Sequence, residues 1–446
     1  MTQDAAPPSS LAVDGPAIDT VLHLPTGQLW DAAALIGSDY GGLMQLRLDL
    51  RTAIHRQNPD YVCPLCGVAV YLVSQPDGRH FSFRHHVEEG NCPARTRNGL
   101  SELQILARKY DGAKEGDRHR QTKAWILQSL AADPAFSEVQ SEIVWKSAST
   151  GRWRRPDVRA RFGDIPVAFE VQLSTTFLRV VAERRAFYLD EGGLLFWVFD
   201  SFDDDDRQMI KDDVFYNNNR NAFVVNSATV ESSLRASSFH LQCFWADPHR
   251  PEDGALKHRL VRFQDLTLDL PNQRAYAFDF DGEATRLYQQ QVDADTVLRG
   301  QFERYWLEFT DTREENLPEW RTLRSALAKR DISVPTYPRM IGDERTLINA
   351  LYSARTGRPV GFGFKKLIQV AHMFPEGDYK QYLRTFRHSL DVYDRSEQIR
   401  HEDRTGKWRA RVKEYLPRLK ANDPDYDTKI EFPELLKFLF PELHTD

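Results

Sequence analysis

Two acidic residues and a neighbouring glutamine have the types and spacing of a catalytic metal site. Asp157 precedes a run of alternating apolar and charged residues, and Glu170 and Gln172 lie in the next apolar run. A carboxylate inside an apolar strand is costly unless it is paired or bound to a cation. Two carboxylates on adjacent strands form a hard oxygen site for Mg2+ or Mn2+, which can activate water and neutralise charge on a phosphoryl transition state. The alternative is an exposed hairpin face that carries ordinary polar residues.

A polar stripe on an expected helix could add to this site. Glu115, His119 and Lys123 recur at every fourth position, so they share one face of a helix. If that face borders the two acids, Glu115 could assist metal binding, and His119 and Lys123 could contact phosphate. The alternative is a solvated face that is stabilised by pairs of side chains four residues apart.

A second group of residues has the pattern of a structural zinc site. Cys63-Pro-Leu-Cys66 places two thiolates on one tight turn, and His85, His86 and Cys92 follow. One histidine and Cys92 would complete a Cys3His tetrahedron, the closed ligand set of structural zinc. With every ligand position filled by protein, the metal would hold the fold together and would not catalyse. The alternative is a pair of core cysteines with unrelated surface histidines.

The choice between the two adjacent histidines depends on the segment before them. Eighteen residues separate Cys66 from His85, and the pattern from Val68 to Phe83 predicts a hairpin. Phe83 would anchor the turn and present His85 inward. We therefore favour His85 over His86 as the ligand.

Three expected strands must bring the two acids together. They run from Glu138 to Lys146, from Trp153 to Phe162 and from Pro166 to Leu173, each with alternating side chains. Asp157 lies in the second strand and Glu170 in the third, and the twelve residues between the two acids suit a hairpin. A helix precedes these strands, and a helix and a further apolar strand follow them.

These motifs occur in a fixed order along the chain. The order is Cys63-x-x-Cys66, Phe83-x-His85, Glu115-x3-His119-x3-Lys123, Arg155-Pro156-Asp157, Glu170-x-Gln172-x-Ser174, and Arg184-x3-Tyr188 before the apolar strand with Trp197. The ordered set resembles the competence protein CoiA-like family. That family joins a zinc-ribbon-like module to a restriction-endonuclease-like domain of the PD-(D/E)xK type. The resemblance covers residues 60 to 200, under a third of the chain.

The resemblance implies roles for individual residues. Asp157 and Glu170 would bind the catalytic metal ion. Gln172 stands where many such nucleases have the catalytic lysine, and because glutamine supplies no positive charge it would orient water or a phosphate. Lys123 could replace that lysine in space; failing that, the metal alone must lower the pKa of the water. Two arginines are candidate contacts for nucleic acid: Arg155 and Arg184. A surface ion pair is the alternative for Arg184.

Composition and charge bound the class of protein. The chain has 446 residues, of which 41% are hydrophobic and 28% charged, and its net charge is −6. This charge argues against a protein that simply coats nucleic acid, but it allows a local basic groove. The longest relevant apolar stretch, Gly192 to Phe199, is far too short to span a membrane. The first ten residues lack the regions of a signal peptide, so we expect a cytoplasmic location without membrane contact.

The length predicts two or three domains, and changes in pattern divide the chain into five segments. These are a disordered N-terminus (1–18), a zinc-binding module (19–100), a nuclease-like domain (101–245), a β-containing connector (246–282) and an α-helical C-terminal domain of unknown role (283–446). The expected fold class is thus a mixed multidomain α+β or α/β chain. It combines a small zinc-ribbon-like module, a restriction-endonuclease-like core and a helical C-terminal region.

The helical region contains one basic segment. Between Arg400 and Lys420 there are eight lysines and arginines against three acidic residues, with Trp408 and Tyr415 interleaved. Such a segment could contact phosphates. The alternative is a solvated amphipathic helix, with the tryptophan in a core.

Together these features predict a metal-dependent nuclease that hydrolyses phosphodiester bonds of DNA, with RNA not excluded. Its cofactors would be catalytic Mg2+ or Mn2+ and structural Zn2+. A role in handling foreign DNA, through uptake, recombination or defence against phage, follows from the resemblance alone. One alternative is a degenerate nuclease fold that only binds nucleic acid. Another is a scaffold protein that uses the helical C-terminal region, where a homodimer or a partner protein could also bind.

Overall fold

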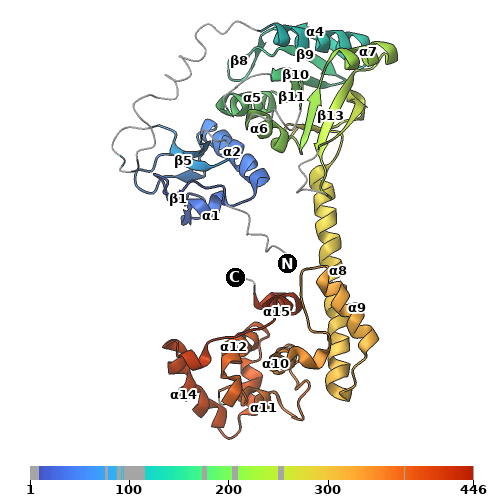
Figure 1. Ribbon diagram of the computed structural model, residues 1–446. Coiled ribbons are helices and arrows are strands. Elements are labelled where there is room, and N and C mark those ends of the chain that lie inside the picture. Colours follow the sequence, from blue (N-terminus) through green and yellow to red (C-terminus); the bar gives the residue numbers. More distant parts are fainter. Residues whose placement is uncertain are drawn as a thin grey trace. The chain divides into compact units, whose positions relative to one another are not determined.

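The chain forms two compact units, Met1–Leu287 and Tyr288–Asp446. They are seen in a computed structural model, drawn in Figure 1. The residues that it describes are 10–75, 79–87, 92, 94, 116–172, 178–202, 209–249, 256–375 and 377–444. The first unit is mixed α/β with one large sheet, and the second is helical. The coarse fold class expected from the sequence is therefore confirmed.

The first unit begins with a small module around the cysteine-rich segment. Its elements are β1 (Thr20–His23), β2 (Gln28–Asp31), α1 (Ala32–Ile36), α2 (Tyr40–His55), β3 (Tyr61–Val62), β4 (Val70–Ser74) and β5 (Phe81–His85). Strands β2, β1 and β3 form one sheet, and β4 and β5 form the expected antiparallel hairpin. Part of the segment expected to be disordered packs here: the Val13 amide donates to the Phe81 carbonyl at 3.0 Å, and Ile18 is buried. Residues 1–9 lie outside the described residues.

A seven-stranded sheet forms the main part of this unit. Its strands in spatial order are β14 (Leu256–Arg262), β13 (His240–Ala246), β12 (Asn221–Val224), β11 (Leu194–Phe199), β10 (Ile165–Gln172), β9 (Val158–Phe162) and β6 (Phe136–Ser141). Strand β10 pairs parallel with β11 and antiparallel with β9. Strand β14 lies in the segment expected to be a connector, yet it pairs with β13 over its whole length, so this segment continues the sheet.

Helices cover both faces of the sheet. Helices α4 (Asp117–Ala132) and α7 (Ser227–Ala236) lie side by side over one face, and α5 (Leu178–Asp190) and α6 (Met209–Asn217) pack on the other (Figure 1). Alternation along β10 explains the two faces, because Phe169 joins the core under α4 whereas Ala168 joins the core under α5. The order α4, β6, β9, β10, α5, β11 is the expected helix, three strands, helix and strand.

Two of the three expected strands are interrupted. Instead of one strand from Glu138 to Lys146, the chain forms β6 and then β7 (Trp145–Lys146). Glu142 between them has φ of 55°, a left-handed conformation that ends regular pairing. The second expected strand divides in the same way into β8 (Trp153–Arg154) and β9, and Asp157 lies just before β9. Strands β7 and β8 pair with each other as a separate short hairpin.

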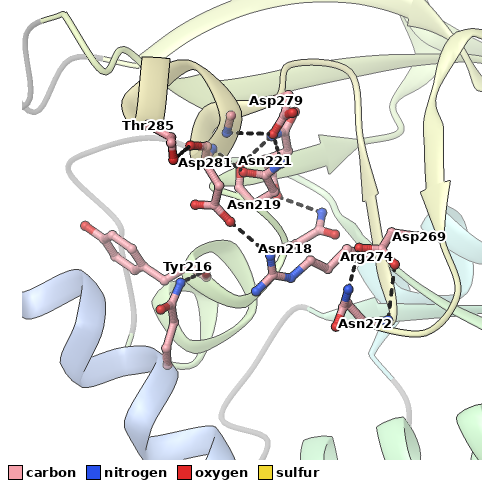
Figure 2. Close-up of polar contacts among 12 residues, drawn as sticks. Tyr216, Asn218, Asn219, Asn221, Asp269, Asn272, Arg274, Asp279, Asp281 and Thr285 are labelled. Carbon is pink, nitrogen blue, oxygen red and sulfur yellow. Dashed lines mark hydrogen bonds and ion pairs between the residues drawn. The ribbon is translucent and has the colours of Figure 1, made fainter. Parts of the chain in front are cut away.

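Side chains of an asparagine-rich turn form hydrogen bonds with the segment after β14, as Figure 2 shows. This segment comprises η3 (Phe263–Asp265), β15 (Thr267–Asp269) and β16 (Arg274–Tyr276). The side chain of Asn221 donates to the Phe278 carbonyl at 2.8 Å, and that of Asn219 donates to Asp279 at 2.9 Å. Asn218 accepts from the Ala275 amide at 2.7 Å. These bonds satisfy buried polar groups, which explains the run of asparagines at this place.

The cysteine-rich module packs on the sheet unit through α2. The guanidinium of Arg47 meets both carboxylate oxygens of Asp213 on α6, at 3.1 and 3.2 Å, and both side chains are buried. Leu48 packs with Val181 of α5 and Ile210 of α6. A bidentate pair with an apolar contact beside it fixes the orientation of α2 on these helices.

The second unit is a helical bundle with its own core. Its elements are the remainder of α8 (Phe280–Thr312), α9 (Leu317–Ala328), η4 (Pro338–Ile341), α10 (Glu344–Thr356), α11 (Leu367–Ala371), η5 (Gly377–Tyr382), α12 (Leu383–Val392), α13 (Ser396–Glu402), α14 (Lys407–Lys420), η6 (Pro424–Tyr426), α15 (Pro433–Leu439) and η7 (Pro441–Leu443). The expected core tryptophans, Trp306, Trp320 and Trp408, are buried in it. Pro417 lies inside α14 and does not end that helix. None of the described helices in either unit is both long and apolar enough to cross a bilayer.

Candidate functional site

Four side chains of the small module converge as the sequence predicted. The ligand atoms of Cys63, Cys66, His85 and Cys92 all lie within 4.8 Å of one another. The sulfur atoms of Cys63 and Cys92 are 3.9 Å apart. Three thiols and one imidazole form a soft, closed donor set, which could hold a metal ion such as zinc. The preference for His85 over His86 is confirmed by its place in this set.

Local backbone geometry explains how the four ligands meet. The Gly67 amide donates to the Cys63 carbonyl at 2.8 Å, which closes the turn that carries the first two cysteines. Gly67 has φ of 71°, a conformation that glycine adopts without a steric penalty. In β5 the side chains of Phe81, Phe83 and His85 are buried on one face, so the strand turns His85 inward.

The two acids predicted to bind a catalytic metal ion also meet. Strands β9 and β10 pair as a hairpin in which Val158 lies opposite Phe169, so Asp157 and Glu170 occupy the next opposed positions. The Asp157 carboxyl lies close enough to Glu170 to help raise the pKa of Glu170. The Val171 amide donates to Asp157 Oδ2 at 2.9 Å and holds that carboxylate against β10. The expectation that a hairpin brings the two acids together is confirmed.

Helix α5 and the sheet enclose Glu170, whose side chain is almost fully buried. Tyr188 donates its hydroxyl proton to Glu170 Oε1 at 3.2 Å, and Arg184 Nη1 lies 2.9 Å from Oε2. The guanidinium of Arg184 is thus the ion-pair partner of Oε2. Burial raises the pKa of Glu170 to about 8, and Asp157 adds to the rise, whereas Arg184 and Tyr188 oppose it.

Asp157 has the opposite electrostatic environment. His119 in the first turn of α4 places Nε2 3.3 Å from Asp157 Oδ2. Burial alone would raise the pKa of Asp157, but the hydrogen bonds from His119 and from the Val171 amide outweigh it, so its pKa lies below the usual range. One carboxyl of the pair is therefore held ionised while its neighbour retains a proton near neutrality. Such a pair of unlike acids is common at functional sites.

Lys123 does not face an open site. It is buried on α4 and forms an ion pair with Glu142. Arg155 Nη2 also lies 3.5 Å from Glu142, and its side chain is 57% exposed. Gln172 is buried at the end of β10, two residues beyond Glu170. Two motif residues, Glu115 and Ser174, lie outside the described residues.

Glu142 is a site residue that the sequence did not reveal. Its amide donates to the carbonyl of Asp157 at 3.2 Å, and its carboxylate joins Lys123 and Arg155. The strand pattern placed Glu142 on an alternating face, and no residue there signals the positive φ that redirects it. Strain of this kind at a non-glycine residue persists where surrounding contacts stabilise it, often at functional sites.

The β7–β8 hairpin beside Asp157 presents apolar and basic side chains together. Trp153 is 56% exposed, and Ile143 and Val144 are about half exposed. Arg152 and Arg154 flank Trp153 and make partial ion pairs with acids of α5. An exposed aromatic ring among cations is the usual surface for nucleic acid bases and phosphates.

Three families match the chain in succession. Residues 27–99 match a domain of unknown function (DUF7830), residues 101–281 another (DUF6035), and residues 308–442 a third (DUF7829). No curated protein and no solved structure matches the chain. The three families name no activity, and nothing among them links the chain to CoiA or to a nuclease family.

Proposed function

We propose that the first unit is a metal-dependent nuclease of the PD-(D/E)xK type that hydrolyses phosphodiester bonds of DNA. The observation that carries this proposal is the placement of Asp157 and Glu170 opposite each other on the β9–β10 hairpin, where Asp157 helps to raise the pKa of Glu170. The order of α4, β6, β9, β10, α5 and β11 supports it, because this is the order that the sequence pattern predicted for the nuclease-like domain. RNA is a second possible substrate of the same chemistry.

Asp157 and Glu170 would hold Mg2+ or Mn2+ through carboxylate oxygens. Glu170 Oε2 fits this role, since it is buried and, among the described residues, its one ion-pair partner is Arg184. When bound, the ion would supply a water of lowered pKa and positive charge for the phosphoryl group. Glu170 must lose its proton to bind a cation, and Arg184 must then release part of its ion pair.

The other residues would position water and substrate. Gln172 would orient the attacking water through its amide, because it has no charge with which to stabilise hydroxide. His119 would hold Asp157 ionised and in place. The Lys123–Glu142 ion pair would hold α4 against the segment between β6 and β7. Arg155 and Trp153 would bind the DNA backbone and a base, respectively.

The cysteine cluster would have a structural role. Its four ligands leave no coordination position for substrate, so zinc would stabilise the module and keep α2 against α5 and α6. We propose a cytoplasmic protein that acts on foreign DNA in uptake, recombination or defence. This role is supported by the resemblance alone.

Three observations favour a second candidate, a degenerate nuclease that binds nucleic acid without cutting it. Gln172 replaces the usual lysine, and Lys123, the substitute considered above, is paired with Glu142. Arg184 Nη1 already lies 2.9 Å from Glu170 Oε2, where a metal ion would have to bind. Replacement of both acids would leave the DNA affinity of a degenerate binder unchanged. In a nuclease the same replacement would abolish DNA cleavage.

Incubation of the full chain with plasmid and with short single-stranded DNA separates the two candidates. Mg2+ or Mn2+ should support cleavage of at least one substrate by the wild type, and Asp157→Ala and Glu170→Ala should each abolish it. DNA binding measured in Ca2+ should persist in both variants. No cleavage of any substrate with unchanged binding would favour the degenerate binder.

A further inference from the structure

A cavity of about 740 Å³ in the second unit has three arginines in its lining. It lies between the end of α8, η4, the start of α10 and the loop around Gly361. Its volume is within the range of small-molecule sites, roughly 300–1,000 Å³. Its cationic lining consists of Arg313, Arg339 and Arg345, against one acidic residue, Glu315. The lining is thus suited to an anion with several negative charges.

Two of these arginines have charge available for a ligand. Arg339 lies 3.7 Å from Glu315. Among the residues that the structure describes, no carboxylate forms an ion pair with Arg313 or Arg345. Arg345 stands in the first turn of α10, where the helix dipole also favours an anion. Arg313 has φ of 61°, a strained conformation for arginine, directly after the end of α8.

A buried amide adds a directed hydrogen-bond donor to the cavity wall. Asn349 is only 6% exposed, and its Oδ1 accepts from Trp306 Nε1 at 2.8 Å. That bond fixes Nδ2 on the other side of the amide, and within the described chain no acceptor is bonded to it. Gly361 adjoins this amide so closely that a Cβ atom there would lie 2.3 Å from Nδ2. Asn349 lines the cavity, so its Nδ2 is available to donate to a ligand oxygen there.

The loop on the same side of the cavity carries aromatic rings. Phe362 lines the cavity and is stacked with Phe364, with ring centroids 5.7 Å apart and planes 17° apart. Phe364 is 38% exposed, and Lys365 and Lys366 follow it. A flat apolar ring next to cationic groups is a typical combination for a base and its phosphates.

We propose that this cavity binds a nucleoside phosphate, whose phosphates contact Arg313, Arg345 and Asn349 and whose base packs on Phe362. This site is separate from the carboxylate pair of the first unit and does not depend on the nuclease proposal. The ligand could be a free nucleotide or the 5′-phosphate end of a DNA strand, which share this chemistry.

Calorimetric titration tests the site in the full chain carrying Asp157→Ala and Glu170→Ala, with no divalent cation added. These changes remove the carboxylate site as a source of binding. ATP should bind at one site per chain, whereas adenosine should not bind. Arg313→Ala and Arg345→Ala should each weaken ATP binding roughly tenfold to a hundredfold, the loss expected for one charge-assisted hydrogen bond. Arg321→Ala, an exposed arginine of α9 that does not line the cavity, is the matched control.

Two further arms decide the class and source of the ligand. Phe362→Leu should weaken ATP binding roughly tenfold and leave tripolyphosphate binding unchanged, since only the nucleotide has a base to stack. If a 5′-phosphorylated oligonucleotide displaces ATP and its unphosphorylated form does not, the ligand is a DNA end. If neither oligonucleotide displaces ATP, the ligand is a free nucleotide. Equal affinities for ATP and tripolyphosphate, with no effect of Phe362→Leu, would overturn the nucleoside assignment. Absence of ATP binding, or equal binding by the arginine variants, would overturn the site.

Discussion

At the scale of single residues, the pKa values of the two acids at the β9–β10 hairpin are shifted in opposite directions. His119 and the Val171 amide lower the pKa of Asp157, whereas burial raises that of Glu170 to about 8. The pair therefore carries about one negative charge near neutrality. A divalent cation would change this balance, because it binds the ionised form of each carboxyl.

The first prediction concerns the pH dependence of metal binding. Below about pH 8 Glu170 is protonated, so binding of Mn2+ must release one proton, and affinity should fall about tenfold for each pH unit below that value. Asp157 should add no dependence there, because its pKa lies below the usual range. Titration calorimetry of Mn2+ between pH 6 and 8, in buffers of different ionisation enthalpy, measures the Mn2+ affinity and the number of protons released. An affinity that is flat over this interval would contradict the shifted pKa of Glu170.

The sequence revealed the acids and placed His119 near them, but it did not reveal the other contacts of the pair. Asp157 and Glu170 stand out because an acid in an apolar strand needs a partner, and strand alternation with a hairpin-sized spacing predicts their contact. The pairing of Arg184 with Glu170 depends on how α5 crosses β10, which no local pattern encodes. The same holds for Glu142, whose role arises from a positive φ.

At the scale of elements, the β7–β8 hairpin precedes Asp157 in the chain and carries exposed aromatic and basic groups. Trp153 in β8 is four residues before Asp157, and its ring is more than half exposed. The sequence placed this segment in two continuous strands, and the break at Glu142 is what separates the hairpin from the sheet. The order of the long, strongly alternating elements was predicted correctly, because burial fixes the periodicity of their side chains.

The second prediction is that Trp153→Ala lowers DNA affinity roughly tenfold, the loss of one stacked base, without changing Mn2+ affinity. Trp30→Ala is the matched control, because Trp30 is also exposed, at 42%, but lies on β2 of the small module. Fluorescence anisotropy with labelled DNA in Ca2+ measures binding without cleavage. Equal losses in the two variants would argue against a specific role for the hairpin.

The third prediction concerns the cysteine cluster. The purified chain should contain one zinc ion, and Cys92→Ser should remove it and lower the melting temperature. The reason is that the metal would link His85 of the β4–β5 hairpin to the turn that carries Cys63 and Cys66. Cys243→Ala is the control: this thiol is buried in the sheet, as the sequence predicted, and takes no part in the cluster. Metal analysis by mass spectrometry measures the content. Full zinc in Cys92→Ser would exclude this ligand set.

At the scale of the whole molecule, each compact unit has its own hydrophobic core. The core of the helical unit draws on residues from Leu298 to Leu443, and the largest core of the first unit is centred on the seven-stranded sheet. The small module is part of the first unit, because α2 packs on α5 and α6 around the buried pair of Arg47 and Asp213. The sequence predicted the module but not this interface, since the two charges lie far apart along the chain.

The fourth prediction tests that interface. Asp213→Ala leaves the Arg47 charge buried without its partner, and we expect a loss of about 3–5 kcal/mol in the free energy of unfolding of the first unit. The double variant Arg47→Met with Asp213→Leu should recover most of this loss, because apolar groups of similar volume replace the pair. Denaturant unfolding followed by tryptophan fluorescence measures both. A single variant as stable as the wild type would show that the pair does not join the module to the sheet.

The most direct test of the nuclease proposal is the rate of DNA cleavage in Mn2+ under single-turnover conditions. We compare the wild type with Asp157→Ala, Glu170→Ala and the control Asp164→Ala, an acid in the turn between β9 and β10 outside the pair. The account predicts cleavage by the wild type and the control, and a loss of roughly two orders of magnitude or more in both pair variants. Equal rates in all four proteins, or no cleavage by the wild type, would contradict a catalytic site at Asp157 and Glu170.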